Sequence, residues 1–185
     1  PGAAPMKRPR FAVLAICTAN ICRSPMMEIL LRDQLDRARF EIASAGVNGM
    51  VGQPMDAMSE MELMRHGLSA DTFRSHPIDQ YLVGAANLIL TATASHRQRI
   101  LEDEPRAMRR SFTLREFAVL CDRVDNAKFT APQLVAEAAA QRQSLKGSMD
   151  VKDPYRRPPR VHRETADQIV EAVDVIAARL NRCLA

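Results

Sequence analysis

The sequence has few aromatic side chains: it contains no tryptophan, two tyrosines and six phenylalanines. Proteins that bind single-stranded nucleic acid stack bases on such rings, so the net charge of +4 alone does not indicate a nucleic-acid partner. Long hydrophobic runs are also missing, since no segment approaches the ~20 apolar residues of a membrane span and the N-terminal stretch lacks the apolar core of a secretory signal. We therefore expect a cytoplasmic protein with no membrane span and no nucleic-acid partner.

Cysteine is scarce as well, with four residues in a chain of 185. This number is too small for a disulfide framework, and two of the four, Cys17 and Cys22, fall in one short loop. A reactive thiol is better preserved in a reducing compartment than in an oxidising one. No cysteine or histidine pair has the spacing of zinc ligands, so we expect no metal and no cofactor. The histidines are scattered, and we interpret each as a surface or capping residue: His66, His76, His96 and His162.

The rest of the composition is that of an ordinary folded domain, with 46% hydrophobic and 26% charged residues. A chain of this length forms one core of normal size. Residues 1–9 are rich in proline and alanine, and we expect them to be a flexible tail. The sequence thus predicts one folded domain over residues 10–185.

The segment around residues 11–35 carries the strongest pattern in the chain. Residues 11–16 form a short apolar run, typical of a strand that is buried on both faces of a parallel sheet. Ser24 is a good helix N-cap and Pro25 suits the first helical position, so a helix is expected over residues 26–35. Cys17 is therefore predicted at the carboxyl end of a strand, facing the N-terminus of a helix.

This placement suits a nucleophilic thiolate inside an oxyanion-binding loop. A helix N-terminus and converging backbone N–H groups stabilise a thiolate and also hold the oxygens of a tetrahedral dianion. Arg23 can grip two of these oxygens with its planar guanidinium, and Asn20 tolerates the left-handed backbone that a tight loop needs. Ser24 can donate a hydrogen bond to the sulfur of Cys17. The alternative is that Cys17 is a buried structural cysteine.

The remaining segments alternate between strand and helix patterns. Apolar alternation and turn signals predict further strands over residues 40–44, 86–91 and 110–112, and caps and apolar periodicity predict helices over residues 56–67, 95–102, 114–120, 130–142 and 166–180. Along the first of these helices Met58, Met61 and Met64 recur at helical spacing, and we interpret them as core residues. Alternating strands and helices predict an α/β fold with a parallel sheet covered on both faces, with ligands bound beyond the carboxyl ends of its strands.

The loop resembles the signature of the low-molecular-weight protein tyrosine phosphatases, and it reads Cys17-Thr18-Ala19-Asn20-Ile21-Cys22-Arg23-Ser24-Pro25. Further matches follow in family order, namely Ser44-Ala45-Gly46, Arg65-His66-Gly67, Asn87-Leu88-Ile89-Leu90-Thr91 and Asp153-Pro154-Tyr155. The resemblance spans nearly the whole chain from Arg10, and it implies a three-layer αβα domain with a four-stranded parallel sheet. Ala19 departs from the usual glycine, so its methyl group must fit the backbone angles of the loop.

The resemblance also implies a mechanism and a substrate. Cys17 attacks phosphorus, Arg23 and the loop residues 18–22 bind the phosphate, and Asp153 protonates the leaving oxygen, with Asp150 as the competing candidate for this acid. The implied intermediate is a phosphocysteine. Ile21 resembles the tyrosine-directed members of the family, so phosphotyrosine in proteins is the expected substrate. The pocket walls are expected at Ile21, Met50 and Tyr155.

Three other functions remain open from the sequence. Members of this family that act on phosphoarginine carry threonine at the position of Ile21, so that activity is one alternative. Arsenate reductases of the same fold need further cysteines to relay a disulfide, and Cys121 and Cys183 lie far from Cys17 in the sequence. A non-catalytic phosphoprotein-binding module is the third alternative, although it would be expected to lack Cys17 or Asp153.

Overall fold

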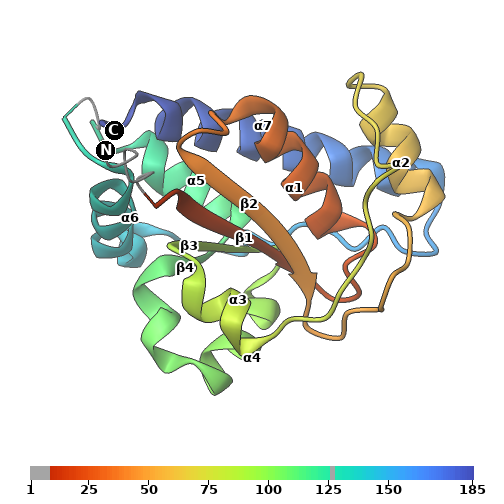
Figure 1. The fold of residues 1–185 in the computed structure, drawn as a ribbon, viewed down its shortest axis with the longest axis horizontal. Helices are drawn as coiled ribbons and strands as arrows, with labels where there is room; N and C mark the ends of the chain where they lie inside the picture. Colours follow the sequence, from red (N-terminus) through yellow and green to blue (C-terminus); the bar gives the residue numbers. More distant parts are fainter. Residues whose placement is uncertain (1–8, 126–127) are drawn as a thin grey trace, which may run out of the picture.

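The computed structural model describes residues 9–125 and 128–185, so nearly all of the tail expected at residues 1–9 lies outside the described residues. Four parallel strands form one sheet in the order β2-β1-β3-β4 (Figure 1). Their bounds are β1 Phe11–Cys17, β2 Phe40–Gly46, β3 Leu88–Thr91 and β4 Ser111–Thr113. The predicted four-stranded parallel sheet is confirmed.

Helices cover both faces of this sheet, as expected for a three-layer αβα domain (Figure 1). The α-helices are α1 Arg23–Gln34, α2 Ala57–Met64, α3 Gln80–Ala85, α4 Ala94–Asp103, α5 Leu114–Asp122, α6 Ala131–Ala140 and α7 Pro159–Arg182, with short 3₁₀ helices at η1 Pro105–Arg110 and η2 Arg142–Ser144. The long helix α7 packs against α1, α2 and α5 on one face, whereas α3, α4 and η1 lie on the other. None of the helices in the described part of the chain is long and apolar enough to cross a bilayer.

The central strand β1 contributes side chains to two cores because successive residues point to opposite faces. Val13, Ala15 and Cys17 belong to the larger core beneath α1, α5 and α7. Leu14 and Ile16 belong to the smaller core with α3 and α4. The apolar run of β1 is continuous because both of its faces are buried. Cys17 is the last residue of this strand and lies on the face covered by α1.

Several helix boundaries follow the predicted signals. Thr113 accepts a hydrogen bond from the backbone N–H of Glu116 (3.2 Å), and the Glu116 carboxylate accepts one in return from the N–H of Thr113 (3.0 Å), which makes a capping box at the start of α5. Gln133 bonds back to the N–H of Thr130 in the same way at the start of α6 (2.9 Å). Asp56 caps α2 through the N–H of Ser59.

Two predicted caps are wrong. Helix α1 begins at Arg23, before the predicted start, and Ser24 makes no capping bond because its hydroxyl faces the sulfur of Cys17. Helix α4 is capped by Thr93 and not by Ser95, since the Thr93 hydroxyl accepts the N–H of His96 (3.2 Å). The short helix α3 was not predicted, although Asp79 caps it in the usual way.

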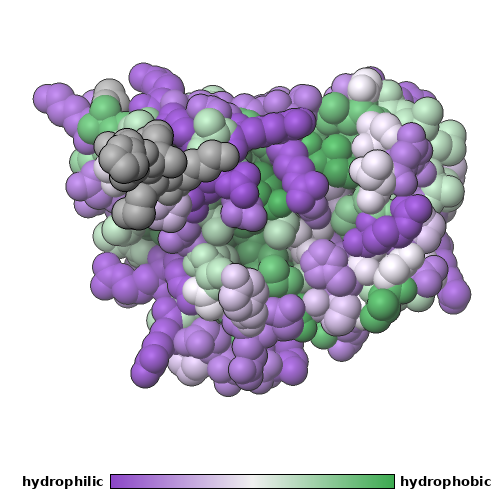
Figure 2. Space-filling view, viewed as in Figure 1, coloured by the Kyte–Doolittle hydropathy of each residue, from purple (hydrophilic) through white to green (hydrophobic). Residues whose placement is uncertain are grey.

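The interpretation of the α2 methionines as core residues is wrong for two of the three, since Met58 alone is partly buried. Met61 and Met64 are each 62% exposed, whereas Ser59, Glu62 and Leu63 form the buried face of this helix. Helix α2 packs mainly on α7. The polar residues Ser59 and Glu62 therefore lie on the buried side of α2, where the methionines were expected. Apolar residues accordingly gather on the surface in the region of α2 (Figure 2).

Candidate active site

The loop after β1 is held by its carbonyl groups. The oxygens of Cys17, Thr18 and Ala19 accept hydrogen bonds from the backbone of residues 47, 48 and 50 (2.9–3.1 Å), and the oxygen of Ile21 accepts one from Asp56 (2.8 Å). By contrast, the backbone N–H groups of residues 18–22 donate to no other group in the described part of the chain. Because an N–H group removed from water needs an acceptor, this arrangement suits a bound oxyanion at the N-terminus of α1.

The tight path of the loop depends on three small or permissive residues. Asn20 adopts φ +58°, the left-handed conformation expected for asparagine in a turn. Ala19 is not among the described residues with positive φ, so its methyl group fits the backbone of the loop, as the departure from the expected glycine requires. A Cβ atom at Gly46, the last residue of β2, would lie 2.4 Å from the backbone oxygen of Thr18. Glycine is therefore required at this point for the loop to approach β2.

Cys17 lies at the centre of a buried hydroxyl and amide network. Its Sγ is 3.0 Å from the Oγ of Ser24. The amide of Asn20 donates to the hydroxyls of Ser24 and Ser44 (2.9 Å each), and the Asn20 side-chain oxygen accepts the backbone N–H of His76 (3.0 Å). The Ser44 hydroxyl in turn donates to the carboxylate of Glu28. The network thus orients the Ser24 hydroxyl toward the sulfur.

Arg23 is a nearly buried cation, with its side chain 5% exposed. Its Nη1 donates to the backbone oxygen of Val151 (3.1 Å), and its Nη2 donates to the hydroxyl of Thr18 (3.4 Å). The Nε atom is buried and has no hydrogen-bond partner among the described residues. A buried charge with an unsatisfied donor is unfavourable, so a bound phosphate oxygen would complete the coordination of this guanidinium.

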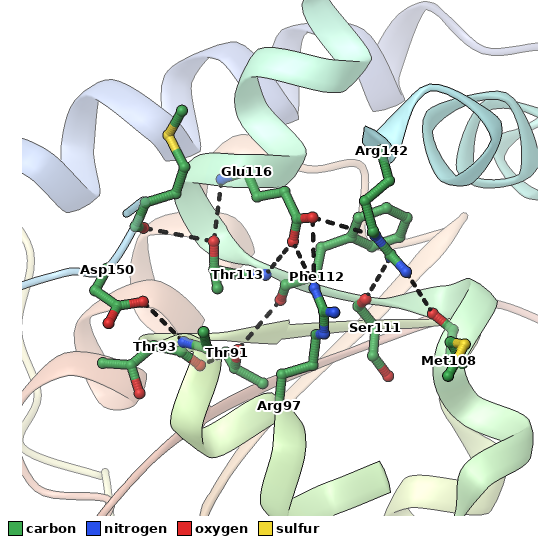
Figure 3. A network of polar contacts seen from close by, with 12 residues as sticks. Thr91, Thr93, Arg97, Met108, Ser111, Phe112, Thr113, Glu116, Arg142 and Asp150 are labelled. Atoms are coloured by element: carbon green, nitrogen blue, oxygen red, sulfur yellow. Dashed lines mark hydrogen bonds and ion pairs between the residues drawn. The ribbon is translucent and has the colours of Figure 1, made fainter. Parts of the chain in front are cut away.

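Of the two candidate acids, Asp153 is the one near the loop. Its Oδ1 lies 3.6 Å from Nη2 of Arg23, and its side chain is 57% exposed. Asp150 instead accepts the backbone N–H of Ala94 at the start of α4 (2.8 Å), as Figure 3 shows. The geometry therefore favours Asp153 over Asp150 as a proton donor to a leaving group above the loop.

The segment that carries Asp153 is anchored to the sheet. The N–H of Val151 donates to the backbone oxygen of Ala92, just beyond β3 (2.8 Å), and the hydroxyl of Thr165 donates to the oxygen of Lys152 (3.1 Å).

A second polar network lies nearby, where the buried carboxylate of Glu116 forms ion pairs with both Arg97 and Arg142 (Figure 3). The carboxylate thus ties α4, α5 and the segment after α6 together near the carboxyl ends of β3 and β4.

Of the three predicted pocket walls, Ile21 belongs to the loop, Met50 bonds to it and Tyr155 bonds to Asp153. Met50 is 45% exposed, and its N–H donates to the oxygen of Ala19 (3.1 Å). Tyr155 is 44% exposed, and its N–H donates to Oδ1 of Asp153 (3.3 Å). Ile21 is partly buried within the loop itself. These three apolar or aromatic side chains thus leave exposed surface around the loop for the body of a substrate.

The second cysteine of the loop, Cys22, is buried. Burial raises the pKa of the Cys22 thiol to about 12, although a hydrogen bond with Ser59 acts in the opposite direction. Cys22 is therefore a neutral thiol near pH 7. Ser59 also lies 3.2 Å from Nδ1 of the buried His162.

Two histidines differ from the surface or capping role that we expected. His162 is 2% exposed, and His96 is 7% exposed and lies against the loop. The Nε2 atom of His96 is 2.9 Å from the hydroxyl of Thr18. Burial, together with the positive charge of Arg23, lowers the pKa of His96 to about 4, so this imidazole is neutral near pH 7.

The sequence reasoning missed His96 and Ser44 as neighbours of the loop. Both follow signals that were present: Ser44 is a polar residue at a buried position near the carboxyl end of β2, and His96 comes five residues after the end of β3. Ligands in parallel sheets bind at this edge. Within the described ranges, no three His, Cys, Asp or Glu residues are grouped to hold a metal ion.

The sequence and fold are similar to those of known phosphatases. A family model described as low molecular weight phosphotyrosine protein phosphatase matches residues 12–132. The chain is 27% identical over 170 residues to a protein-arginine-phosphatase from Geobacillus stearothermophilus, covering 92% of this chain and 96% of that protein. It is 33% identical over 94 residues to the low molecular weight protein-tyrosine-phosphatase Etp from Escherichia coli K12, covering 51% and 62%.

Solved structures agree with these matches. The YwlE arginine phosphatase from G. stearothermophilus superposes with a TM-score of 0.71 at 28% identity, covering 92% of each chain. The low molecular weight protein tyrosine phosphatase from T. tengcongensis gives the same TM-score at 26% identity, covering 92% of this chain and 99% of that one. Because the family model matches more than half of the chain, the protein belongs to the low molecular weight phosphotyrosine protein phosphatase family.

Proposed function

We propose that this phosphatase hydrolyses phosphotyrosine in proteins through a phosphocysteine intermediate. The observation that carries the proposal is the loop of residues 18–22, whose backbone N–H groups are free to bind an oxyanion while its carbonyl groups are bonded elsewhere. Cys17 stands at the start of this loop and Arg23 at its end. Such a ring of fixed donors stabilises the charge that develops on phosphate oxygens during transfer.

The first step is attack by the Cys17 thiolate on phosphorus. The bond between phosphorus and the tyrosine oxygen breaks, and this oxygen takes the proton of Asp153 as it leaves. In the second step water attacks the phosphocysteine, Asp153 accepts the proton of this water, and the Cys17 thiolate leaves. The products are tyrosine and inorganic phosphate. The Ser24 hydroxyl, 3.0 Å from Sγ, stabilises the thiolate before the first step and after the second.

Two features support phosphotyrosine as the substrate. Ile21 provides an apolar wall, and Tyr155 is exposed beside Asp153, so a phenyl ring can pack between them while its phosphate enters the loop. The 57% exposure of the Asp153 side chain leaves its carboxyl group accessible to a leaving oxygen.

Phosphoarginine is a second candidate, because the sequence and the solved structure from Geobacillus stearothermophilus described above are both named as arginine phosphatases, and each match covers 92% of this chain. Against it, Ile21 offers no hydroxyl to the polar guanidinium of phosphoarginine, and a buried polar group without a partner is unfavourable. An Ile21→Thr variant tests this argument. It should raise the ratio of phosphoarginine to phosphotyrosine turnover, and an unchanged ratio would remove Ile21 from the argument.

An arsenate reductase would need a cysteine relay, and the geometry opposes one. The backbone oxygen of Cys183 bonds to Arg39, just before the start of β2, whereas Cys17 stands at the opposite end of the seven-residue strand β1. At ~3.3 Å per residue these two ends of the sheet are roughly 20 Å apart. Cys121 is buried in α5, and its burial raises the pKa of its thiol to about 12.

The decisive experiment compares turnover of p-nitrophenyl phosphate, a phosphotyrosyl peptide, a phosphoarginyl peptide and arsenate by the wild-type protein. We expect phosphatase activity with the highest kcat/KM on the phosphotyrosyl peptide. Cys17→Ser should abolish turnover but keep vanadate binding, and Arg23→Lys should lose nearly as much because a point charge cannot form the planar fork. More than about a tenth of wild-type turnover in Cys17→Ser would overturn the proposal.

Two finer expectations belong to this proposal. All four cysteines are buried and none is joined in a disulfide, which is consistent with the cytoplasmic location expected from the sequence. Cys17 and Cys22 stand on the same loop, so oxidation of the nucleophile to a sulfenic acid is expected to be followed by a disulfide with Cys22.

A further inference from the structure

His96 lies outside the signature loop but contacts it through one hydroxyl. Its two ring nitrogens each face a threonine: Nδ1 is 2.9 Å from Oγ1 of Thr93, and Nε2 is 2.9 Å from Oγ1 of Thr18. Thr93 is itself fixed, because its hydroxyl also accepts the N–H of His96 as the N-cap of α4. The imidazole is therefore held rigidly at the end of β3, and its neutral form satisfies both hydroxyls in either tautomer.

The hydroxyl of Thr18 is in turn an acceptor for Arg23, with Nη2 at 3.4 Å. The other terminal nitrogen, Nη1, donates to the oxygen of Val151 at 3.1 Å. The guanidinium is thus held on two sides by neutral acceptors, one on the segment before Asp153 and the other on the loop, supported by His96. Its buried Nε remains for the substrate.

The same nitrogen, Nη2, also faces the carboxylate of Asp153 at 3.6 Å. If Thr18 did not hold Nη2, this carboxylate would be the remaining acceptor for it among the described groups. A tighter pair would turn the guanidinium away from the loop. It would also stabilise the ionised form of Asp153, which cannot donate a proton to a leaving group.

We propose that His96 is a positioning residue: through the hydroxyl of Thr18 it holds Arg23 in the orientation that binds phosphate and keeps Arg23 from forming a tight ion pair with Asp153. This inference rests on the proposed function, since it assigns Arg23 to phosphate and Asp153 to the leaving group. It extends the site to the first turn of α4.

The test uses separate variants to remove the hydroxyl of Thr18 and the imidazole of His96. Thr18→Val removes the hydroxyl at nearly constant shape, and Thr18→Ser keeps it. His96→Leu removes the support, and His96→Gln can return an amide nitrogen to the position of Nε2. Thr91→Val is the control, because Thr91 is a buried threonine whose hydroxyl bonds to the oxygen of Thr93 and not to the loop.

The first measurement is orthophosphate binding by calorimetry, made in the Cys17→Ser background so that no turnover occurs. Thr18→Val and His96→Leu should weaken binding by about tenfold, the usual size of a lost hydrogen bond to a charged group. Thr18→Ser, His96→Gln and Thr91→Val should bind within about threefold of the parent. Equal binding by all variants would overturn the proposal even if the phosphatase assignment stands.

The second measurement is the pH profile of kcat/KM for phenyl phosphate with Cys17 intact. In Thr18→Val the basic limb should move to lower pH by about half a unit or more, because Asp153 loses its proton more readily beside a closer Arg23. A variant that only contained less folded protein would have a lower kcat/KM at every pH, and the basic limb would stay at the same pH. If His96→Leu does not fold, Thr18→Val decides alone, and an unmoved limb in that variant overturns the proposal. Absence of turnover in the wild type would refute the proposed function, and orthophosphate binding would still decide the role of His96.

Discussion

Replacing Ser24 by alanine removes the hydroxyl closest to the nucleophile. The Ser24 oxygen already accepts the amide of Asn20 at 2.9 Å, so its proton is directed to an acceptor. Two acceptors are in reach, the sulfur of Cys17 at 3.0 Å and the backbone oxygen of Ala45 at 3.4 Å. The shorter contact and the negative charge of a thiolate favour donation to Cys17.

The size of the effect follows from the charge on the acceptor. A hydrogen bond to a charged group contributes about 1.5–3 kcal/mol, which corresponds to roughly 10-fold to 150-fold in a rate that depends on it. The sulfur leaves as a thiolate when the phosphocysteine is hydrolysed, so this second step should slow the most. Asn20 keeps its bond to Ser44 in the variant, so the loop should keep its shape.

Two assays check this prediction. In rapid-mixing kinetics with p-nitrophenyl phosphate, Ser24→Ala should show a larger burst of nitrophenol and a kcat lower by about 10-fold or more. Alkylation of Cys17 by iodoacetate at pH 6 should slow, because the sulfur that reacts loses its hydrogen bond from Ser24. Ser111→Ala is the control, since Ser111 is a fully buried serine that bonds to the oxygen of Ala107 at a distance from the loop. A kcat within about threefold of wild type, with unchanged alkylation, would refute the reasoning.

Three further predictions follow from the same geometry. Asp153→Asn should slow phenyl phosphate ~10²–10⁴-fold and p-nitrophenyl phosphate far less, whereas Asp150→Asn should lack this selectivity; the reverse pattern would move the acid to Asp150. Peroxide should produce a Cys17–Cys22 disulfide, detected by peptide mass spectrometry and reversed by dithiothreitol, and its closure should quicken as pH rises toward the raised Cys22 pKa of about 12. No linked peptide and no recovery would exclude this protective role. Gly46→Ala should lower the free energy of unfolding by about 1–3 kcal/mol and weaken vanadate binding, because the new methyl group would clash with the backbone oxygen of Thr18. Unchanged denaturation and unchanged vanadate binding would contradict the need for glycine at this position.

The sequence by itself determined the fold class, and it placed the centre of the candidate site at the carboxyl end of a buried strand. A continuous apolar run before Cys17 predicted a strand buried on both faces, and the structure confirms it as β1. The Thr113 capping box and the cap at Asp56 were equally readable. These features depend on residues within about one helical turn or along one strand, so their physical cause lies in neighbouring positions.

The tertiary structure alone decided which distant residues support that centre. His96 meets Thr18 across 78 positions and Val151 meets Arg23 across 128, and neither pairing leaves a periodic signal. Asp153 and Asp150 look alike in the sequence, and the choice between them depends on which carboxylate α4 engages as a cap. Likewise, the exposure of the α2 methionines depends on how α2 packs against α7. Short-range preferences specify the elements, whereas the contacts that complete the site form only when the sheet brings its carboxyl ends together.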